Sequence, residues 1–378
     1  MIRVFCWSRL SVISVLFLSA FVLGIISPLQ AQNIPLQFQL ILSPEQGAAS
    51  GLREIWQLPL VINSDRNQII AVTPLNDSVY VLTKQGYLIS IDATAGTTQW
   101  KIQLPGSGST TLRPTNYAPN QILIVCQGQI MIIDSRSGKI LESASLSFAP
   151  ATNPLVGDDH IYLGALNDSM YALTAEFPIS NVWFQLSVGD SFTSDPVLVQ
   201  DTLIFASRSG TLWGKPADDG QGGWNRQLGG SVIASPAASD EYVYYPCMDG
   251  KVYSVEAATG IVPWTTRLPG KLNLQPVVTE DEVLVPTGDQ GLFCLDADSG
   301  NITWGPVSQV DGIAAIIGST IYGATTNNCI KVINVKQGTV TATAQLQGKI
   351  IFAPNTSGTV IYLASEDGRV AALTPNSQ

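Results

Sequence analysis

Charged side chains are scarce in this chain of 378 residues, and positive ones are scarcer than negative ones. Charged residues make up 13% of the sequence, with 19 Lys and Arg against 29 Asp and Glu, so the formal net charge is −10. Nucleic-acid binding needs clustered basic side chains that neutralise phosphates, whereas these cations are spread along the whole chain. The composition therefore predicts no nucleic-acid partner.

Histidine occurs only once, as His160. A serine triad needs a histidine as its base, and the sequence contains no G-x-S-x-G motif that would present a nucleophilic serine. No pair of carboxylates can be assigned to one cleft from the sequence either. We therefore expect no hydrolase activity and a structural or solvent-exposed role for His160.

Long apolar runs are missing too, except near the N-terminus. Arg3 and Arg9 precede an apolar run from Leu10 to Ile26, and a small residue, Ala31, follows. This order is typical of a secretory signal peptide over residues 1–31, cleaved after Ala31; an uncleaved membrane anchor is the alternative. Because Cys6 precedes the apolar run, it is no lipid-attachment site. We expect an exported protein, periplasmic or extracellular, that reaches a membrane only through a partner or an uncleaved signal.

What the sequence does contain is a repeat with a period of about 40 residues. Its clearest copies are Val79–Trp100, Tyr242–Trp264 and Val283–Trp304. In each copy, runs of alternating apolar and polar residues are interrupted by turns, usually at glycine. Period-two alternation between such turns indicates consecutive antiparallel hairpins.

The first turn of the unit recurs eight times. Asp and Asn tolerate positive φ better than most residues, so they replace glycine in two copies. The turn residues are Gly86, Gly128, Asp168, Gly210, Gly250, Gly291, Asn328 and Gly368. About fourteen residues before the turn, a proline is expected to open another strand; these prolines are Pro114, Pro154, Pro196, Pro236, Pro276 and Pro354. Each unit is then four strands long, which is the size of a propeller blade.

The two ends of the chain complete this count. The last copy stops without its fourth strand, and the N-terminal segment REIWQLPL supplies one with Trp56 in the matching position. We predict an all-β, eight-bladed β-propeller of four-stranded antiparallel blades over residues 52–378, closed by pairing of its N- and C-terminal segments. Residues 32–51 form a lead-in of unknown structure.

A motif at the second turn makes a family resemblance specific. The pattern D-x-x-x-G-x-x-x-W occurs at Asp92, Gly96 and Trp100, and it returns at Asp296 to Trp304. It resembles the repeat of the pyrroloquinoline-quinone-type (PQQ-type) propellers. That resemblance implies that an outer-strand tryptophan packs on the neighbouring blade, here Trp56, Trp100, Trp183, Trp224, Trp264 and Trp304.

The sequence departs from this pattern in several copies. Glu142 and Ala342 replace the tryptophan in copies two and seven, and copy three has an insertion around Phe177 and Pro178. We expect looser blade junctions there. The acids before the second turns favour capping of those turns over calcium binding; they are Asp92, Asp134, Glu256 and Asp296.

The PQQ-type superfamily contains enzymes and non-enzymatic members. Its quinoprotein dehydrogenases carry two adjacent cysteines at the quinone, and no adjacent pair occurs here. We therefore predict a non-enzymatic protein-binding or scaffolding module of the cell envelope that holds no cofactor. We expect it to be a monomer. The alternatives are a quinoprotein dehydrogenase and an extracellular sensor or adhesion module.

The repeat register also places candidate contacts and the cysteines. The loops between blades meet around one mouth of the central channel, where the candidate contacts to a ligand or partner are Arg113, Asp195, Asn273 and Gln275. The cysteines beyond the signal fall in blades two, five, six and seven, so we expect free thiols that are buried at least in part; they are Cys126, Cys247, Cys294 and Cys329. Blades five, six and seven are consecutive, so a strained bond between two of the last three cysteines is the alternative.

Overall fold

The computed structural model describes residues 39–62, 67–105, 111–355 and 358–376. The chain divides into two units, Met1–Gln39 and Leu40–Gln378, and the second contains all the strands named below. The predicted signal peptide, residues 1–31, and the lead-in residues 32–38 lie outside the described residues. In the ranges given above, no helix has both the length and the apolar character needed to cross a membrane.

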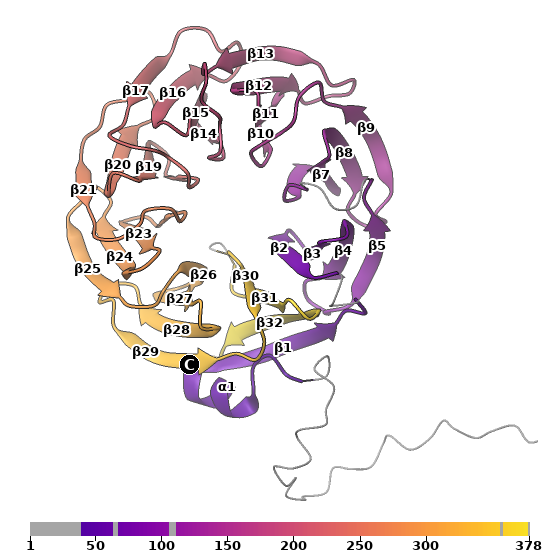
Figure 1. Cartoon of the computed structure of the whole chain (residues 1–378). Coiled ribbons are helices and arrows are strands. Elements are labelled where there is room, and N and C mark those ends of the chain that lie inside the picture. The colour runs from indigo at the N-terminus through magenta and orange to yellow at the C-terminus, as the bar shows by residue number, and fades with distance from the viewer. Residues whose placement is uncertain (1–38, 63–66, 106–110, 356–357, 377–378) are drawn as a thin grey trace, which may run out of the picture. The chain divides into compact units, whose positions relative to one another are not determined.

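The strands of the second unit form eight antiparallel sheets of four strands each, arranged as the blades of a ring (Figure 1). Blade 1 contains β2 (Ile69–Leu75), β3 (Ser78–Thr83), β4 (Tyr87–Asp92) and β5 (Thr98–Gln103). Blade 2 contains β6 (Thr115–Ala118), β7 (Gln121–Cys126), β8 (Gln129–Asp134) and β9 (Ile140–Ser145). Blade 3 contains β10 (Leu155–Val156), β11 (His160–Gly164), β12 (Ser169–Thr174) and β13 (Asn181–Leu186). Blade 4 contains β14 (Val197–Val199), β15 (Thr202–Ala206), β16 (Thr211–Pro216) and β17 (Trp224–Gln227).

The second half of the chain repeats this arrangement. Blade 5 contains β18 (Ala237–Ala238), β19 (Tyr242–Cys247), β20 (Lys251–Glu256) and β21 (Thr265–Arg267). Blade 6 contains β22 (Val277–Val278), β23 (Glu282–Thr287), β24 (Gly291–Asp296) and β25 (Ile302–Val307). Blade 7 contains β26 (Gly312–Ile317), β27 (Thr320–Ala324), β28 (Cys329–Asn334) and β29 (Val340–Gln345). Blade 8 contains β30 (Ile350–Ala353), β31 (Ile361–Ser365), β32 (Arg369–Pro375) and, from the start of the chain, β1 (Leu52–Pro59). The predicted eight-bladed propeller is confirmed.

The core of the propeller is divided among the blade junctions. Each apolar cluster combines side chains from two adjacent blades, as Val81 of blade 1 and Ala364 of blade 8 do. The middle strands are therefore covered on both faces, and all six residues of β3 are buried. As in other repeat proteins, stability comes from each unit and its contacts with its neighbours.

The ring closes by pairing of its two ends. β1 pairs antiparallel with β32, and Trp56 lies opposite Ala372. The backbone N–H of Leu60 also donates to the carbonyl of Gly368, at an N–O distance of 2.7 Å. The closure predicted from the sequence is confirmed, and it leaves neither terminal strand without a partner in its sheet.

The first turns have the backbone conformation that the repeat predicts. Asp168 has a φ of +60° and Asn328 a φ of +57°, in the left-handed region that their glycine counterparts also occupy. Five of the six prolines directly precede a strand. Pro354 is the exception, because the residues of blade 8 that pair with β31 lie before it, in β30, so the proline follows its strand.

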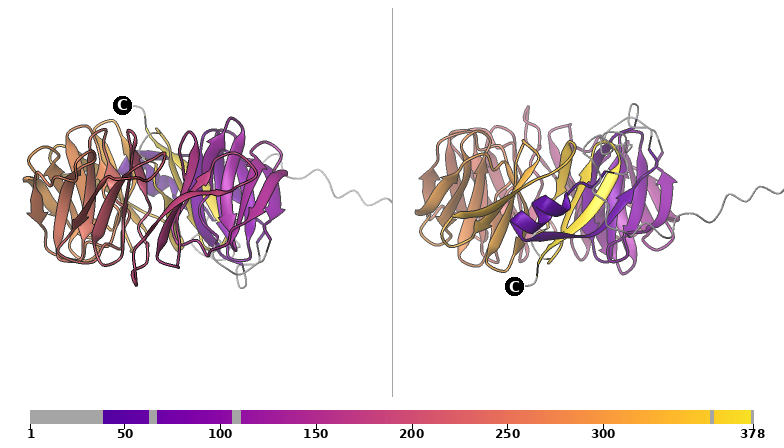
Figure 2. Two further views of the ribbon diagram at one scale, coloured as in Figure 1. Left: turned by 90° about the horizontal axis from the view of Figure 1, so that it is seen from above. Right: turned by 90° about the horizontal axis from the view of Figure 1, so that it is seen from below.

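The lead-in contributes a short helix to the propeller unit. α1 (Pro44–Ser50) begins after Ser43, whose side chain accepts a hydrogen bond from the N–H of Gln46. Before the helix, Ile41 is fully buried in the cluster between blades 7 and 8. α1 contacts the outer strand β29, where Ala342 replaces the tryptophan. Figure 2 shows the helix at the rim of the ring, beside β1.

The six outer-strand tryptophans join consecutive blades. Each indole N–H donates to a backbone carbonyl of the next blade at 2.6 to 3.1 Å, and Trp264 bonds in this way to Ala297. The ring also lies against a glycine of that blade; a Cβ built on Gly300 would come within 2.4 Å of Trp264. These glycines leave the space that the indoles occupy.

Candidate binding surfaces of the propeller

Three of the four predicted mouth residues occupy one position of the repeat. Arg113, Asp195 and Gln275 each directly precede the strand-opening proline of blades 2, 4 and 6, and Asn153 and Ser235 take this place in blades 3 and 5. The backbone N–H of Arg113 donates to Oδ1 of Asn153 at 3.0 Å, and the N–H of Asn153 donates to Oδ1 of Asp195 at 2.8 Å. The N–H of Asp195 donates to Oγ of Ser235 at 3.1 Å.

This series of hydrogen bonds runs from blade to blade around the channel. Both carboxylate oxygens of Asp195 accept from Asn153, since Nδ2 of Asn153 donates to Oδ2 at 3.0 Å. Gln275 continues the series by donating from Nε2 to the carbonyl of Pro236 at 3.1 Å. The Asp195 carboxylate and the Gln275 amide nitrogen are thus engaged in joining blades.

A cavity of about 540 Å³ lies where the inner ends of the blades meet. Arg113 and Gln275 line it, together with Asp311 at the start of blade 7; Asp195 and Asn273 are not among its lining residues. The remaining wall is largely apolar, formed by residues such as Pro236, Pro276, Pro286, Pro354 and Ile313. Asp311 is a site residue that the repeat pattern missed, because no proline marks its position in blade 7.

The channel cavity offers little for catalysis. Oδ2 of Asp311 already accepts a hydrogen bond from the N–H of Thr326 at 2.6 Å, and Arg113 is exposed. None of the lining residues is a histidine, cysteine or serine. Over the described parts of the chain, no group of three or more His, Cys, Asp and Glu side chains is arranged to hold a metal ion.

The aspartates at the second turns, Asp92, Asp134 and Asp296, cap those turns as predicted, whereas Glu256 accepts from the hydroxyl of Thr259. Oδ1 of Asp92 accepts from the N–H groups of Thr94 and Ala95, and Oδ1 of Asp296 accepts from the N–H of Ser299. The hydrogen bonds from Ser299 lower the pKa of the Asp296 carboxyl. His160 packs against Tyr162, with ring centroids 6.0 Å apart.

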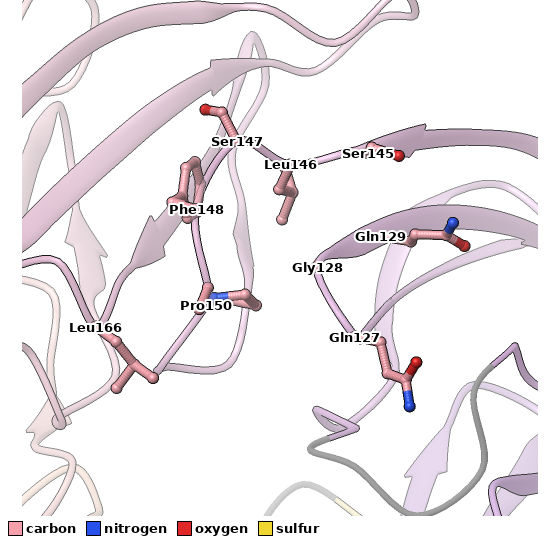
Figure 3. A pocket seen from close by; sticks show the side chains of 10 residues that line it. Gln127, Gly128, Gln129, Ser145, Leu146, Ser147, Phe148, Pro150 and Leu166 are labelled. Atoms are coloured by element: carbon pink, nitrogen blue, oxygen red, sulfur yellow. The ribbon is translucent and has the colours of Figure 1, made fainter.

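A second cavity, also of about 540 Å³, lies between blades 2 and 3 (Figure 3). Gln127 and Gln129 flank the first turn of blade 2 on one side of it, and Leu146, Phe148 and Pro150 lie on the segment that leads into blade 3. Leu166, in the first turn of blade 3, completes the wall and is 63% exposed. The sequence signal for this site is an apolar residue in a turn where most other copies have a polar one.

A smaller cavity of about 350 Å³ separates α1 from β1. Leu40, Leu42 and Leu52 contribute to its wall, as does Glu54. Oε2 of Glu54 is buried and has no hydrogen-bond partner among the described residues. Burial raises the pKa of this carboxyl, which favours its neutral form.

Eight four-stranded antiparallel blades joined by tryptophan–glycine contacts define a PQQ-type β-propeller. The family model described as outer membrane protein assembly factor BamB matches residues 48–226 and 215–319, and the chain belongs to this family. Comparison with the curated proteins gave no match.

Several solved structures share the fold. BamB from Moraxella catarrhalis is 17% identical with a TM-score of 0.69, and the match covers 85% of this chain and 97% of that one. The computationally designed Ika8 protein is 13% identical with a TM-score of 0.68, covering 85% and 99% of the two chains. Saccharomyces cerevisiae Sqt1 is 9% identical with a TM-score of 0.67, covering 81% and 95%. At these identities the similarity shows the fold alone.

Proposed function

We propose that this protein is an exported, non-enzymatic module that binds and scaffolds other proteins in the cell envelope, and that it acts as a monomer. Its family is described as an outer membrane protein assembly factor, which supports a role in protein assembly. The N-terminal sequence, with its apolar run before Ala31, supports export. The observation that carries the proposal is the cavity between blades 2 and 3.

The chemistry of this cavity suits a protein side chain rather than a reaction. None of its ten lining residues is ionisable, so it offers no group for acid–base catalysis at neutral pH. Its apolar part, which includes Leu146, Phe148 and Leu166, would receive an apolar side chain. The amide of Gln129 stands at its edge (Figure 3) and would bond the backbone beside that side chain.

Crosslinking in the cell that makes the protein tests this function. A photoreactive amino acid replaces Leu166 in the full chain, and a matched variant carries it at Met248, the equivalent turn position of blade 5, which is also exposed. We expect Leu166 to give a discrete crosslink to another envelope protein and Met248 to give none. Failure to crosslink any protein at Leu166, or the same products from both positions, contradicts the proposal.

Quinone-dependent oxidation is the competing function, because PQQ-type repeats also occur in enzymes. The purified protein is supplied with PQQ and calcium and assayed with alcohols and sugars. We expect no turnover above a heat-killed control. Turnover above that control would overturn the non-enzymatic function.

A further inference from the structure

The outer strand of blade 3 has an unusually apolar exposed face. Val182, Phe184 and Leu186 of β13 are 42%, 57% and 47% exposed. Phe184 and Leu186 alternate with Trp183, whose indole N–H bonds to Ala217 of blade 4, so these two side chains lie on the opposite face of the sheet, toward blade 2. Val182 lies at a register shift in the pairing of β12 with β13 and extends the exposed apolar surface at that end of the strand. We call Val182, Phe184 and Leu186 the blade 3 stripe.

The other repeats provide internal comparisons for this stripe. The equivalent positions on the outer strand of blade 1 are Gln99, Lys101 and Gln103, and those of blade 7 are Thr341, Thr343 and Gln345. The propeller can therefore be built with polar residues at these positions. Propeller folding alone does not require the apolar residues of blade 3.

The stripe is continuous with the cavity between blades 2 and 3. Phe184 lies opposite Tyr171 on the neighbouring strand, with ring centroids 5.9 Å apart. Tyr171 in turn stacks on Phe148 of the cavity wall at 4.0 Å. Val188, which follows β13, is 87% exposed. Together these side chains form an apolar surface of a kind that marks protein contacts.

Acidic side chains lie at both ends of this surface. At the Leu186 end, Oδ2 of Asp168 accepts from the N–H of Gly189, and Asp190 caps the N–H of Ser209. Glu176 lies at the Val182 end, and so does Glu142 of blade 2. Burial raises the pKa of the nearby Tyr117 phenol most, and the charges of these two glutamates raise it further. Arg208 is a basic side chain on the blade 4 side, where its backbone N–H bonds to Ser191.

β13 is also the outermost strand of its sheet, so one of its edges carries no further strand of the blade. We propose that this edge and the blade 3 stripe receive an extended segment of a partner protein, apolar at alternate positions and flanked by Lys or Arg. The added strand would continue the sheet, so its apolar side chains would lie beside the stripe. This inference rests on the proposed protein-binding function.

The acidic side chains around the stripe favour a basic extended segment over a second copy of this chain. A second copy of this chain would bring the same acids, including Asp168, Asp190 and Glu176, against themselves, and its formal charge of −10 adds to the repulsion. Lys or Arg at the ends of an extended segment would instead complement these acids. A basic partner is therefore favoured over self-association.

The test measures the affinity of defined peptides for the purified full chain. The first peptide alternates valine with threonine and ends in lysines, the second has aspartates in place of the lysines, and the third has the first composition in an amphipathic helical order. Only the first should bind, with slowed amide hydrogen exchange in β13, and added salt should weaken it. Equal binding of the second or third peptide, or no binding of the first, overturns the inference.

The substitutions for the test variant are taken from the equivalent positions of another blade. Val182→Thr, Phe184→Thr and Leu186→Gln together give blade 3 the stripe of blade 7 without changing the net charge. We expect this variant to weaken peptide binding roughly tenfold or more, since apolar contact area is lost. The control, Ile302→Thr with Val340→Thr, removes apolar residues of similar exposure from blades 6 and 7 and should bind unchanged. Equal loss in both variants contradicts the inference.

Further outcomes separate this inference from the proposed function. Glu142→Gln with Glu176→Gln should weaken the lysine peptide several-fold and reduce its salt dependence; unchanged binding contradicts the role of charge. A dimer that becomes a monomer in the stripe variant identifies a second copy as the occupant and overturns the inference. A partner crosslinked at Leu166 while no peptide binds β13 leaves the function standing and rejects the inference alone.

Discussion

The hydroxyl of Tyr117, in the innermost strand of blade 2, donates a hydrogen bond to the backbone carbonyl of Ala175 in blade 3 at 2.5 Å. Ala175 is the residue of blade 3 that corresponds to Ala217 and Ala257, whose carbonyls accept from outer-strand tryptophans. Blade 2 has Glu142 in place of that tryptophan. A tyrosine from the inner strand thus makes the hydrogen bond that an indole makes at other junctions.

This relationship predicts the effect of removing one oxygen atom. Tyr117→Phe keeps the ring but leaves the Ala175 carbonyl without this donor, so we expect a loss of about 1 to 3 kcal/mol in the free energy of unfolding. Denaturant unfolding measures it. Tyr242→Phe is the control, because no described residue bonds to the Tyr242 hydroxyl. Equal stability of the two variants would show that the bond contributes nothing.

The architecture was predictable because the repeat sets the spacing of its turns. Asp168 and Asn328 were recognisable as turn residues because their positions match those of six glycines. The bond from Tyr117 to Ala175 was not predictable in this way, since it joins residues 58 positions apart and occurs where the repeat is broken. The packing of α1 on blade 7 was not predictable either, because the lead-in lies outside the repeat and has no counterpart in the other copies.

The close contact between tryptophan and glycine predicts a second stability effect. In Gly300→Ala the new Cβ would lie 2.4 Å from the Trp264 ring, and the backbone φ of +71° disfavours a side chain. We expect a loss of roughly 1 to 3 kcal/mol from crowding and strain. Gly312→Ala is the control, because no atom lies within 4 Å of its built Cβ. Thermal unfolding should separate them, and a Gly300→Ala variant as stable as the control contradicts the docking contact.

Ring closure predicts different effects for two N-terminal deletions. Removing residues 1–60 takes away β1 and exposes the edge of β32, so the protein should aggregate. Removing residues 1–39 retains β1, α1 and the buried Ile41, so the protein should remain a folded monomer. Size-exclusion chromatography of the purified variants tells these outcomes apart. A monomeric, folded 61–378 fragment would show that pairing of the ends is dispensable.

The candidate site was only partly accessible to sequence reasoning. The repeat located the channel mouth, and Arg113 and Gln275 do line its cavity. It could not show that both carboxylate oxygens of Asp195 accept hydrogen bonds from Asn153, because those bonds depend on the distance between blades. The blade 3 stripe required knowledge of which face of β13 remains uncovered, and alternation within one strand does not reveal this.

Burial of a tyrosine predicts alkaline destabilisation. Burial, assisted by Asp218, Asp159 and Asp158, raises the pKa of Tyr162 from 10.0 to about 12. Below pH 10 both states keep the proton; from there to about pH 12 the unfolded chain releases it more readily, so stability falls as pH rises. Urea unfolding across this range checks the slope. Tyr162→Phe should make the slope shallower while losing the bond to Ala217. Part of the slope should remain, because burial also raises the pKa of other tyrosines, among them Tyr253 and Tyr244. An unchanged slope contradicts the assignment to Tyr162.

The last prediction concerns the cysteines. Cys126 and Cys329 lie in blades 2 and 7, and Cys247 and Cys294 lie in blades 5 and 6. No blade holds two of them, and a disulfide needs Cα atoms within about 7 Å, whereas packed sheets lie about 10 Å apart. Three of these thiols are buried, and Cys329 is half-buried, with its Sγ 2.9 Å from Oε1 of Gln345. Free thiols are therefore expected even after export.

Thiol titration tests this in two steps. In the folded protein Cys329 should react first, because the other three are buried and burial raises the pKa of Cys247 and Cys294 to about 11. After denaturation, a chain lacking residues 1–31, and with them Cys6, should give all four thiols. Two thiols or none would mean that cysteines of different blades pair. The argument that the spacing between blades keeps these thiols apart would then be wrong.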